Sequence, residues 1–192
     1  MEIFGRIRQK IGNIILAKKI IRIKRKVYYL NIENIRKIGI VWDASRSEDF
    51  SSLSKFQQKM HERNIGVEII GYYPGEELPG RLTAIKYLSC IRKQELSFFY
   101  QPVTNDSEKF VIAPFDVLID INFEKKFPLH YISALSAASF KVGLYDSDER
   151  DKSIFDLMIE LKKPVHIDNY LEMINSGSSD ENAKKIIDHE KI

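Results

Sequence analysis

Three aspartates lie at or just after the ends of short apolar runs, where chemistry is commonly found in α/β proteins. They are Asp43 after Ile38–Trp42, Asp120 within Val117–Ile121 and Asp146 after Val142–Tyr145. Because the carboxyl ends of parallel strands meet at one edge of a sheet, we expect the three carboxylates to face a common cleft. Together they could hold a hard cation through oxygen ligands, or one could act as a general base. Each alone is more simply a turn-forming or helix-capping residue.

Other catalytic and cofactor signatures are missing. The turn after the first apolar run reads WDASRS, without the glycines of a dinucleotide fingerprint or a phosphate loop. The four histidines show no metal-ligand spacing, and the single cysteine, Cys90, suits a small buried hydrophobe on a helix. The sequence therefore assigns no metal and no cofactor.

The charge distribution separates an arm from a body. Residues 1–37 contain 11 Lys or Arg and 2 Glu, whereas the other 155 residues carry a net charge of −6. Ile3, Ile7, Ile11 and Ile14 recur at helical spacing and predict an amphipathic helix. Nine basic residues of this arm are the candidate binding residues: Arg6, Arg8, Lys10, Lys18, Lys19, Arg22, Lys24, Arg25 and Lys26.

The basic helix allows three interpretations. It packs on its own domain with a solvated outer face, it lies on an anionic membrane surface, or it contacts nucleic acid. An acidic partner protein is a related possibility. We expect the helix to project from the body or to dock only in part. No apolar run approaches the length of a membrane span, and we expect a cytoplasmic protein, with the inner membrane as one surface for the arm.

The body alternates short apolar runs with amphipathic segments, which predicts an open, mostly parallel Rossmann-like sheet with helices on both faces. We divide the chain into a helical arm (1–36), an α/β domain (37–175) and a polar tail (176–192). The strands are expected at 38–42, 67–72, 96–100, 117–121, 142–145 and 165–167. The helices are expected at 49–63, 82–92, 129–138, 154–161 and 170–174.

Two resemblances accompany this pattern. The segment FDVLIDINFEKKFPLHYISALSAASFKVGLYD, which begins at Phe115, together with RKIGIVWD and IFDLMIELKKP, resembles a small uncharacterised Bacteroidetes family. The phrases at Asp116–Ile121 and Ser139–Gly143 also resemble the N-terminal half of ADP-heptose-type glycosyltransferases. That second resemblance implies a role on the acceptor for Asp49, which here follows Glu48 where the family has Gly.

These observations favour a non-catalytic binding or adaptor domain that docks through its basic helix to an anionic membrane surface, nucleic acid or an acidic protein. The alternative is a small transferase that uses the acidic sheet edge, with a metal ion or a second subunit. For Asp49 itself we expect a helix-stabilising role in the first turn of its helix.

Overall fold

The computed structural model describes residues 2–23, 25–28, 32–83, 85–144, 153–161, 167–168, 171–172 and 183–187. The helices are α1 (Glu2–Ile20), α2 (Phe50–Glu62), α3 (Asn105–Ile112) and α4 (Phe127–Leu135), and four short 3₁₀ turns are η1 (Ile32–Asn34), η2 (Ser47–Asp49), η3 (Gly80–Leu82) and η4 (Lys93–Glu95). The strands are β1 (Lys37–Asp43), β2 (Gly66–Tyr73), β3 (Leu88–Arg92), β4 (Val117–Asp120), β5 (Phe140–Leu144), β6 (Leu157–Leu161) and β7 (Ala183–Ile187).

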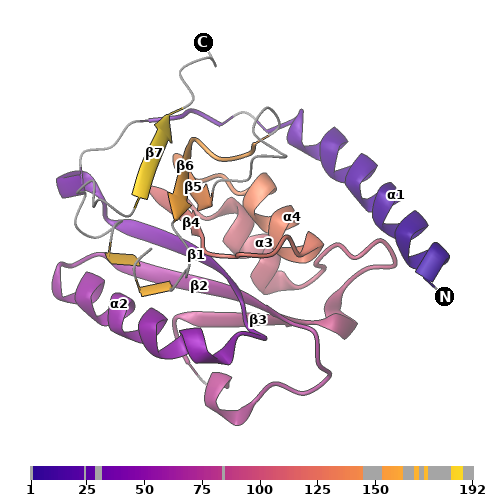
Figure 1. Ribbon diagram of the computed structural model, residues 1–192, viewed down its shortest axis with the longest axis horizontal. Helices are drawn as coiled ribbons and strands as arrows, with labels where there is room; N and C mark the ends of the chain where they lie inside the picture. Colours follow the sequence, from indigo (N-terminus) through magenta and orange to yellow (C-terminus); the bar gives the residue numbers. More distant parts are fainter. Residues whose placement is uncertain are drawn as a thin grey trace.

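The strands form a single sheet in the order β3-β2-β1-β4-β5-β6-β7 (Figure 1). The first six strands of that order pair in parallel, and β7 pairs antiparallel with β6. The order 3-2-1-4-5-6 is that of the doubly wound Rossmann fold, in which the chain reverses direction across the sheet between the first and fourth strands. The predicted fold class is confirmed.

Successive side chains of β1 point to opposite faces of the sheet, and helices cover both faces. Ile40 and Trp42 point to the face covered by α2, where they join Leu53 in one buried cluster. Val41, between them in sequence, points to the opposite face and joins Ile132 of α4 in a second cluster. Since both faces are covered, every residue of β1 after Lys37 is buried, as expected for a parallel strand.

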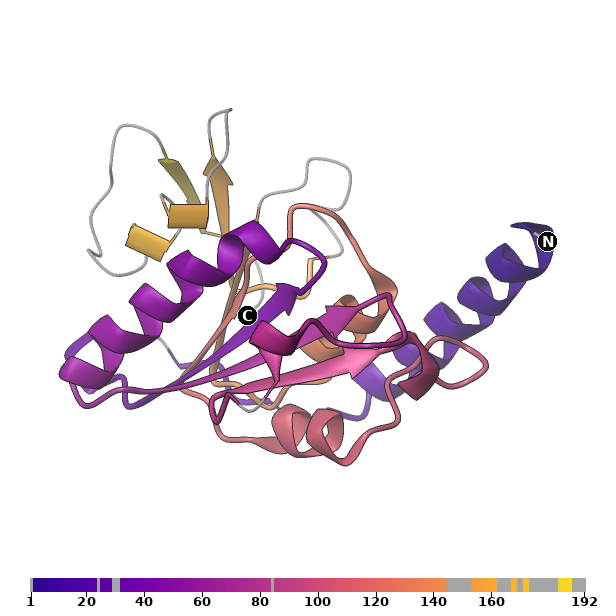
Figure 2. The same ribbon diagram turned by 90° about the horizontal axis from the view of Figure 1, so that it is seen from below.

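Helix α1 forms an additional layer outside α4. Leu16 of α1 is buried in a small cluster with Phe127 and Tyr131 of α4. Gly12 allows the close approach, because a Cβ there would lie 2.6 Å from the backbone oxygen of Phe99. Figures 1 and 2 both show α1 running outward from this contact, with the N-terminus at its free end. The helix is docked in part, as expected.

The helix expected at 82–92 is wrong. Only its first residue belongs to η3, and 88–92 form the edge strand β3, paired with β2 through Ile69 and Leu88. The apolar spacing fits either element, and main-chain pairing to β2 decided between them. Cys90 therefore lies on a strand, half-buried, and burial raises the pKa of its thiol to about 11.

Two further expectations are wrong. Residues 157–161 form β6 and not a helix, since their backbone pairs with β5. Residues 96–100 form a loop and not a strand, because the backbone N–H groups of Phe99 and Gln101 donate to the Ser97 hydroxyl. Such side-chain bonds compete with strand pairing.

Several residues for which a role or an element was expected lie outside the described residues. They are Lys24 of the arm and, in the α/β domain, Asp146, Val165, His166 and most of 170–174. Ile167 is helical where a strand was expected. Within the expected polar tail, 183–187 form β7, which extends the sheet beyond the boundary drawn at residue 175.

Candidate functional site

Two surfaces contain the candidate residues: the carboxyl edge of the sheet and the outer side of α1. At the sheet edge, Asp43 ends β1 and Asp120 ends β4, on adjacent parallel strands whose register pairs Val41 with Asp120. This is the point where the strand order reverses, the usual ligand position in such sheets. The placement of Asp43 and Asp120 on adjacent strands is as predicted, while Asp146 lies outside the described residues.

Both carboxylate oxygens of Asp43 are already engaged within the chain. One accepts hydrogen bonds from the Ser45 backbone N–H (3.1 Å) and hydroxyl (2.6 Å). The other lies 2.5 Å from the ammonium of Lys126, which also donates to the Ser45 hydroxyl at 3.0 Å. The backbone bond two residues ahead is an Asx turn, so Asp43 closes the turn between β1 and η2.

Asp120 repeats this arrangement in a more buried position. Its Oδ1 accepts from the Asn122 backbone N–H (3.1 Å) and side-chain amide (2.5 Å), and its Oδ2 accepts from the Ser133 hydroxyl (2.7 Å). Desolvation raises the pKa of the Asp120 carboxyl, against the opposing effect of these hydrogen bonds. The amide of Asn122 also donates to the Val41 carbonyl and so ties β4 to β1.

Asp49 was expected in the first turn of its helix, and the structure places it one residue before α2 begins. It occupies the N-cap position with helical backbone angles and without a side-chain bond to the helix. Its carboxylate instead accepts from Arg46 Nε at 2.8 Å. Desolvation by burial raises the pKa of Asp49 most strongly, and Arg46 opposes that rise. The Arg46 guanidinium in turn lies over the Phe123 ring, 4.6 Å from its centroid.

The chemistry available at this edge follows from these pairings. Among the described residues, no group of three or more His, Cys, Asp or Glu could hold a metal ion. The Asp43 carboxylate is already bonded to Ser45 and Lys126, so a substrate would have to displace these partners to reach it. The contacts of Asp43 and Asp120 match the turn-forming role of aspartates at strand ends.

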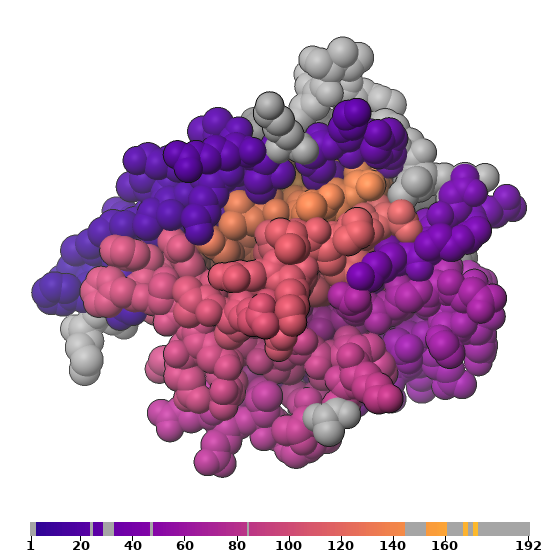
Figure 3. All heavy atoms as spheres, turned by 180° about the vertical axis from the view of Figure 1, so that it is seen from behind, coloured from indigo at the N-terminus to yellow at the C-terminus, as the bar shows by residue number. Residues whose placement is uncertain are grey.

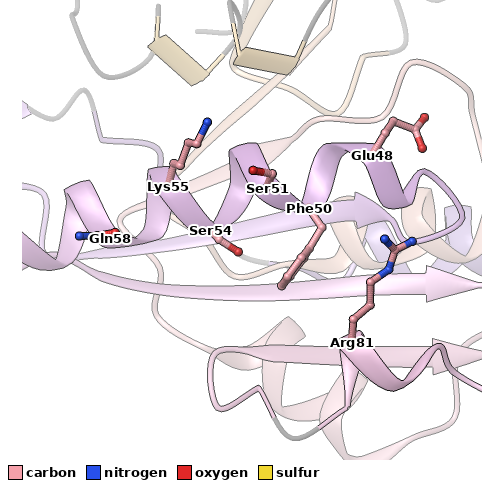
Figure 4. A pocket seen from close by; sticks show the side chains of 7 residues that line it. All are labelled: Glu48, Phe50, Ser51, Ser54, Lys55, Gln58 and Arg81. Atoms are coloured by element: carbon pink, nitrogen blue, oxygen red, sulfur yellow. The ribbon is translucent and has the colours of Figure 1, made fainter.

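A shallow groove lies between α2 and η3. Its lining residues are Glu48, Phe50, Ser51, Ser54, Lys55, Gln58 and Arg81. Figure 4 shows Phe50 extending from α2 and Arg81 from η3 into the space between these elements, with Glu48 and Lys55 pointing outward. Most of these side chains are exposed and both charge signs are present, so the groove has no buried polar group to orient a ligand.

The second surface is the side of α1 that faces away from the body. Each residue advances the helix by about 100°, so Ile14 lies opposite both Gly12 and Leu16, which contact the body. The isoleucines expected to form the apolar face are therefore the exposed ones. This apolar stripe comprises Ile3, Phe4, Ile7, Ile11 and Ile14, each more than a third exposed.

The basic candidates of α1 and the following segment divide into two groups. Three bond to the body: Arg8 donates to the Phe98 carbonyl, Lys19 to the Tyr131 hydroxyl and Arg25 to both oxygens of Asp156. Five have exposed side chains that make no hydrogen bond or ion pair with any described residue: Arg6, Lys10, Lys18, Arg22 and Lys26. Lys24 lies outside the described residues.

A buried lysine at the opposite edge of the sheet escaped the sequence analysis. Lys141 is 3% exposed, and its ammonium donates to the Ala134 carbonyl in the last turn of α4. Desolvation, and then the charge of Arg25, lower the pKa of Lys141 to about 7, while Asp156 opposes the shift. The only signal in the sequence was a lysine in an otherwise apolar strand, which spacing alone cannot distinguish from a solvated one.

Comparison with known proteins completes the description. No helix among the described residues is long and apolar enough to cross a membrane. Neither the curated proteins nor the solved structures contain a match to the chain. The model of one family, described as a family of unknown function (DUF6913), matches residues 8–174. That match includes most of α1 and the six parallel strands β1 to β6, and the chain therefore belongs to the DUF6913 family of unknown function.

Proposed function

We propose that this protein is a non-catalytic binding domain that attaches to an anionic membrane surface through the outer side of α1. The observation that carries the proposal is the apolar stripe on a helix whose other side is held by the body. Monomeric domains rarely leave a contiguous row of large apolar side chains in water without a partner for it.

The charges around the stripe favour lipid as that partner. Residues 3–32 contain nine Lys or Arg and no Asp or Glu. Of the exposed cations, Arg6, Lys10 and Lys18 lie on α1 beside or within the stripe. A helix in a bilayer interface buries its apolar side to the level of the acyl chains and keeps cations near the anionic headgroups.

The expected energies are sufficient for reversible attachment. Full burial of an isoleucine side chain contributes roughly 1.5–3 kcal/mol, and a cation near an anionic bilayer contributes about 1 kcal/mol. Nucleic acid would use the cations but would leave the isoleucines in water, since its recognition relies on phosphate contacts and base stacking. The transferase alternative has less support, because Lys126 and Ser45 already occupy the Asp43 carboxylate.

The test is co-sedimentation of the full chain with phosphatidylcholine vesicles that contain or lack phosphatidylglycerol, at low and at physiological salt. We expect binding only to the anionic vesicles and weaker binding at the higher salt. The variant Ile7→Gln/Ile11→Gln removes two exposed stripe residues and should weaken binding by at least about tenfold. Ile112→Gln is the matched control, because Ile112 of α3 is as exposed as Ile3, at 73%.

A parallel measurement uses single- and double-stranded RNA. Binding to RNA without binding to anionic vesicles would overturn the membrane proposal in favour of nucleic acid. Absence of binding to both would overturn attachment to an anionic surface and would leave a protein partner for the stripe. Equal vesicle binding by the stripe variant and the parent chain, with unchanged circular dichroism, would also contradict the proposal.

A further inference from the structure

A tight loop beside α1 displays a second exposed apolar group. Residues 97–101 are closed by backbone hydrogen bonds from Ser97 to Gln101 (2.8 Å) and from Tyr100 to Ser97 (3.0 Å). The Ser97 hydroxyl accepts two more backbone N–H groups, those of Phe99 and Gln101. The side chain of Phe98, at the tip of this loop, is 66% exposed.

One residue of the loop has a strained backbone conformation. Tyr100 adopts a left-handed backbone with φ of 61°, one of two non-glycine residues with positive φ among those described. Such a backbone costs of the order of 1 kcal/mol or more for an aromatic residue and is found where the surroundings enforce it. The result is a defined, projecting phenyl ring in place of a strand.

Arg8 of α1 binds this loop through a hydrogen bond and two ring contacts. Its Nε donates to the Phe98 carbonyl at 2.6 Å, and its guanidinium lies 4.3 Å from the Phe98 ring centroid and 4.4 Å from that of Tyr100. The guanidinium is therefore placed between two aromatic rings, a geometry that suits arginine because it is weakly hydrated.

The Phe98 ring lies near the apolar stripe of α1. Phe4, the most exposed of its residues, precedes Arg8 by four positions and so lies on the same edge of α1. Figure 3 shows the pink loop segment directly beside the indigo N-terminal helix, in agreement with Figure 2. Phe4 and Arg8 thus share one edge of α1, and the Phe98 ring, which contacts Arg8, brings a second exposed aromatic group to that edge from an element distant in sequence.

We infer that Phe98 enters the same anionic bilayer as the stripe, and that Arg8 is the positioning residue that holds the loop for it. This inference rests on the membrane attachment proposed above. Two contact points on different elements would restrict the tilt of the body on the membrane more than the apolar stripe of α1 does alone.

The experiment places a tryptophan at one position at a time in the full chain: Phe4→Trp, Phe98→Trp and, as control, Ile112→Trp. The native Trp42 is 1% exposed in the core and supplies a constant background. Vesicles of phosphatidylcholine and phosphatidylglycerol, with and without brominated acyl chains, report insertion by a blue shift and by quenching. We expect both signals for Phe4→Trp and Phe98→Trp and neither for Ile112→Trp.

The outcomes separate the two proposals. A response from Phe4→Trp without one from Phe98→Trp would overturn the role of the loop and leave the membrane attachment intact. No response from either position would overturn both. As an independent measurement, Phe98→Ala should weaken vesicle binding about threefold to tenfold, and Arg8→Ala should abolish the Phe98→Trp quenching while that of Phe4→Trp remains. Unchanged binding of Phe98→Ala would contradict the inference.

Discussion

The carboxyl edge of the sheet and the outer side of α1 both present charged side chains, but these are paired in opposite ways. At the sheet edge, Asp43 meets Lys126 and Asp120 meets Ser133, so the charged and polar groups find partners inside the chain. On α1, Lys10 and Lys18 find none among the described residues, and the isoleucines beside them face water. The difference indicates where the fold is complete and where it needs an external partner.

The same contrast divides α1 itself. Arg8, Lys19 and Arg25 use their charge to fasten the arm to the body, whereas Arg6 and Lys10, on neighbouring turns, do not. Spacing along the helix did not separate these groups, because position relative to the body decides which cation finds an acceptor. Substitution of a paired group should therefore change the stability of the protein, whereas substitution of an unpaired group should change its binding to vesicles.

The largest effect is expected from the buried cation, Lys141. Between pH 7 and pH 10.5 the unfolded chain holds the lysine proton and the folded chain does not, so this group makes the protein more stable as pH rises through that window. The whole contribution is up to about 5 kcal/mol, from the shift of the Lys141 pKa down to about 7.

Lys141→Met should remove this dependence. Urea unfolding from pH 6 to pH 10 should show the variant more stable than the parent at the acidic end, with the difference shrinking as pH rises. Vesicle binding at neutral pH should be unchanged. Parallel stability curves for the two chains would show that Lys141 titrates normally.

The next largest effect concerns the paired carboxylate at the sheet edge. Asp120→Ala leaves the Ser133 hydroxyl and the Asn122 amide with a lost acceptor in a buried place, which costs about 2–3 kcal/mol. Asp120→Asn keeps an acceptor and should cost clearly less. Chemical denaturation measures both, and a fall in vesicle binding without a fall in stability would break the contrast between the two surfaces.

Substitution of two glycines of α1 tests whether the side of the helix that faces the body is as closely packed as the contacts indicate. Gly12→Ala should destabilise the protein by about 1 kcal/mol or more, because the clash with the Phe99 carbonyl at 2.6 Å outweighs the gain in helix propensity. Gly5→Ala meets only the Tyr100 hydroxyl at 3.6 Å and should stabilise the chain by about 0.5–1 kcal/mol. Thermal unfolding compares them, and equal signs would argue against the observed docking of α1.

The smallest effects come from a matched pair of lysines. Lys126→Met removes a paired cation and should cost about 1 kcal/mol of stability with no change in vesicle binding. Lys10→Met removes an exposed cation without a described partner and should leave stability unchanged. Its expected cost is about fivefold in binding to phosphatidylglycerol vesicles, from about 1 kcal/mol per cation. The opposite pattern would show that the sheet edge, and not α1, contacts the membrane.

Much of the fold was predictable because it depends on local patterns. The apolar run Ile38–Trp42 and the helical spacing of residues 49–63 were strong enough to predict β1 and α2. Segments 82–92 and 154–161 were mistaken for helices because a short apolar run fits the period of a helix as well as that of a strand. Only pairing with β2 and β5 makes them strands, and those partners lie outside the short window in which the apolar period is read.

The sequence by itself determined the α/β class, the basic helix and the scarcity of acidic residues along it, since composition and period are local properties. Tertiary structure alone decided which side of that helix is buried. Gly12 and Leu16 face the body because a glycine admits the close approach of the Phe99 carbonyl, whereas the more strongly apolar side, with Ile7 and Ile11, has no surface of the body to cover it. Hydrophobicity ranks the two sides of a helix, but steric fit to a neighbouring surface selects the side that packs.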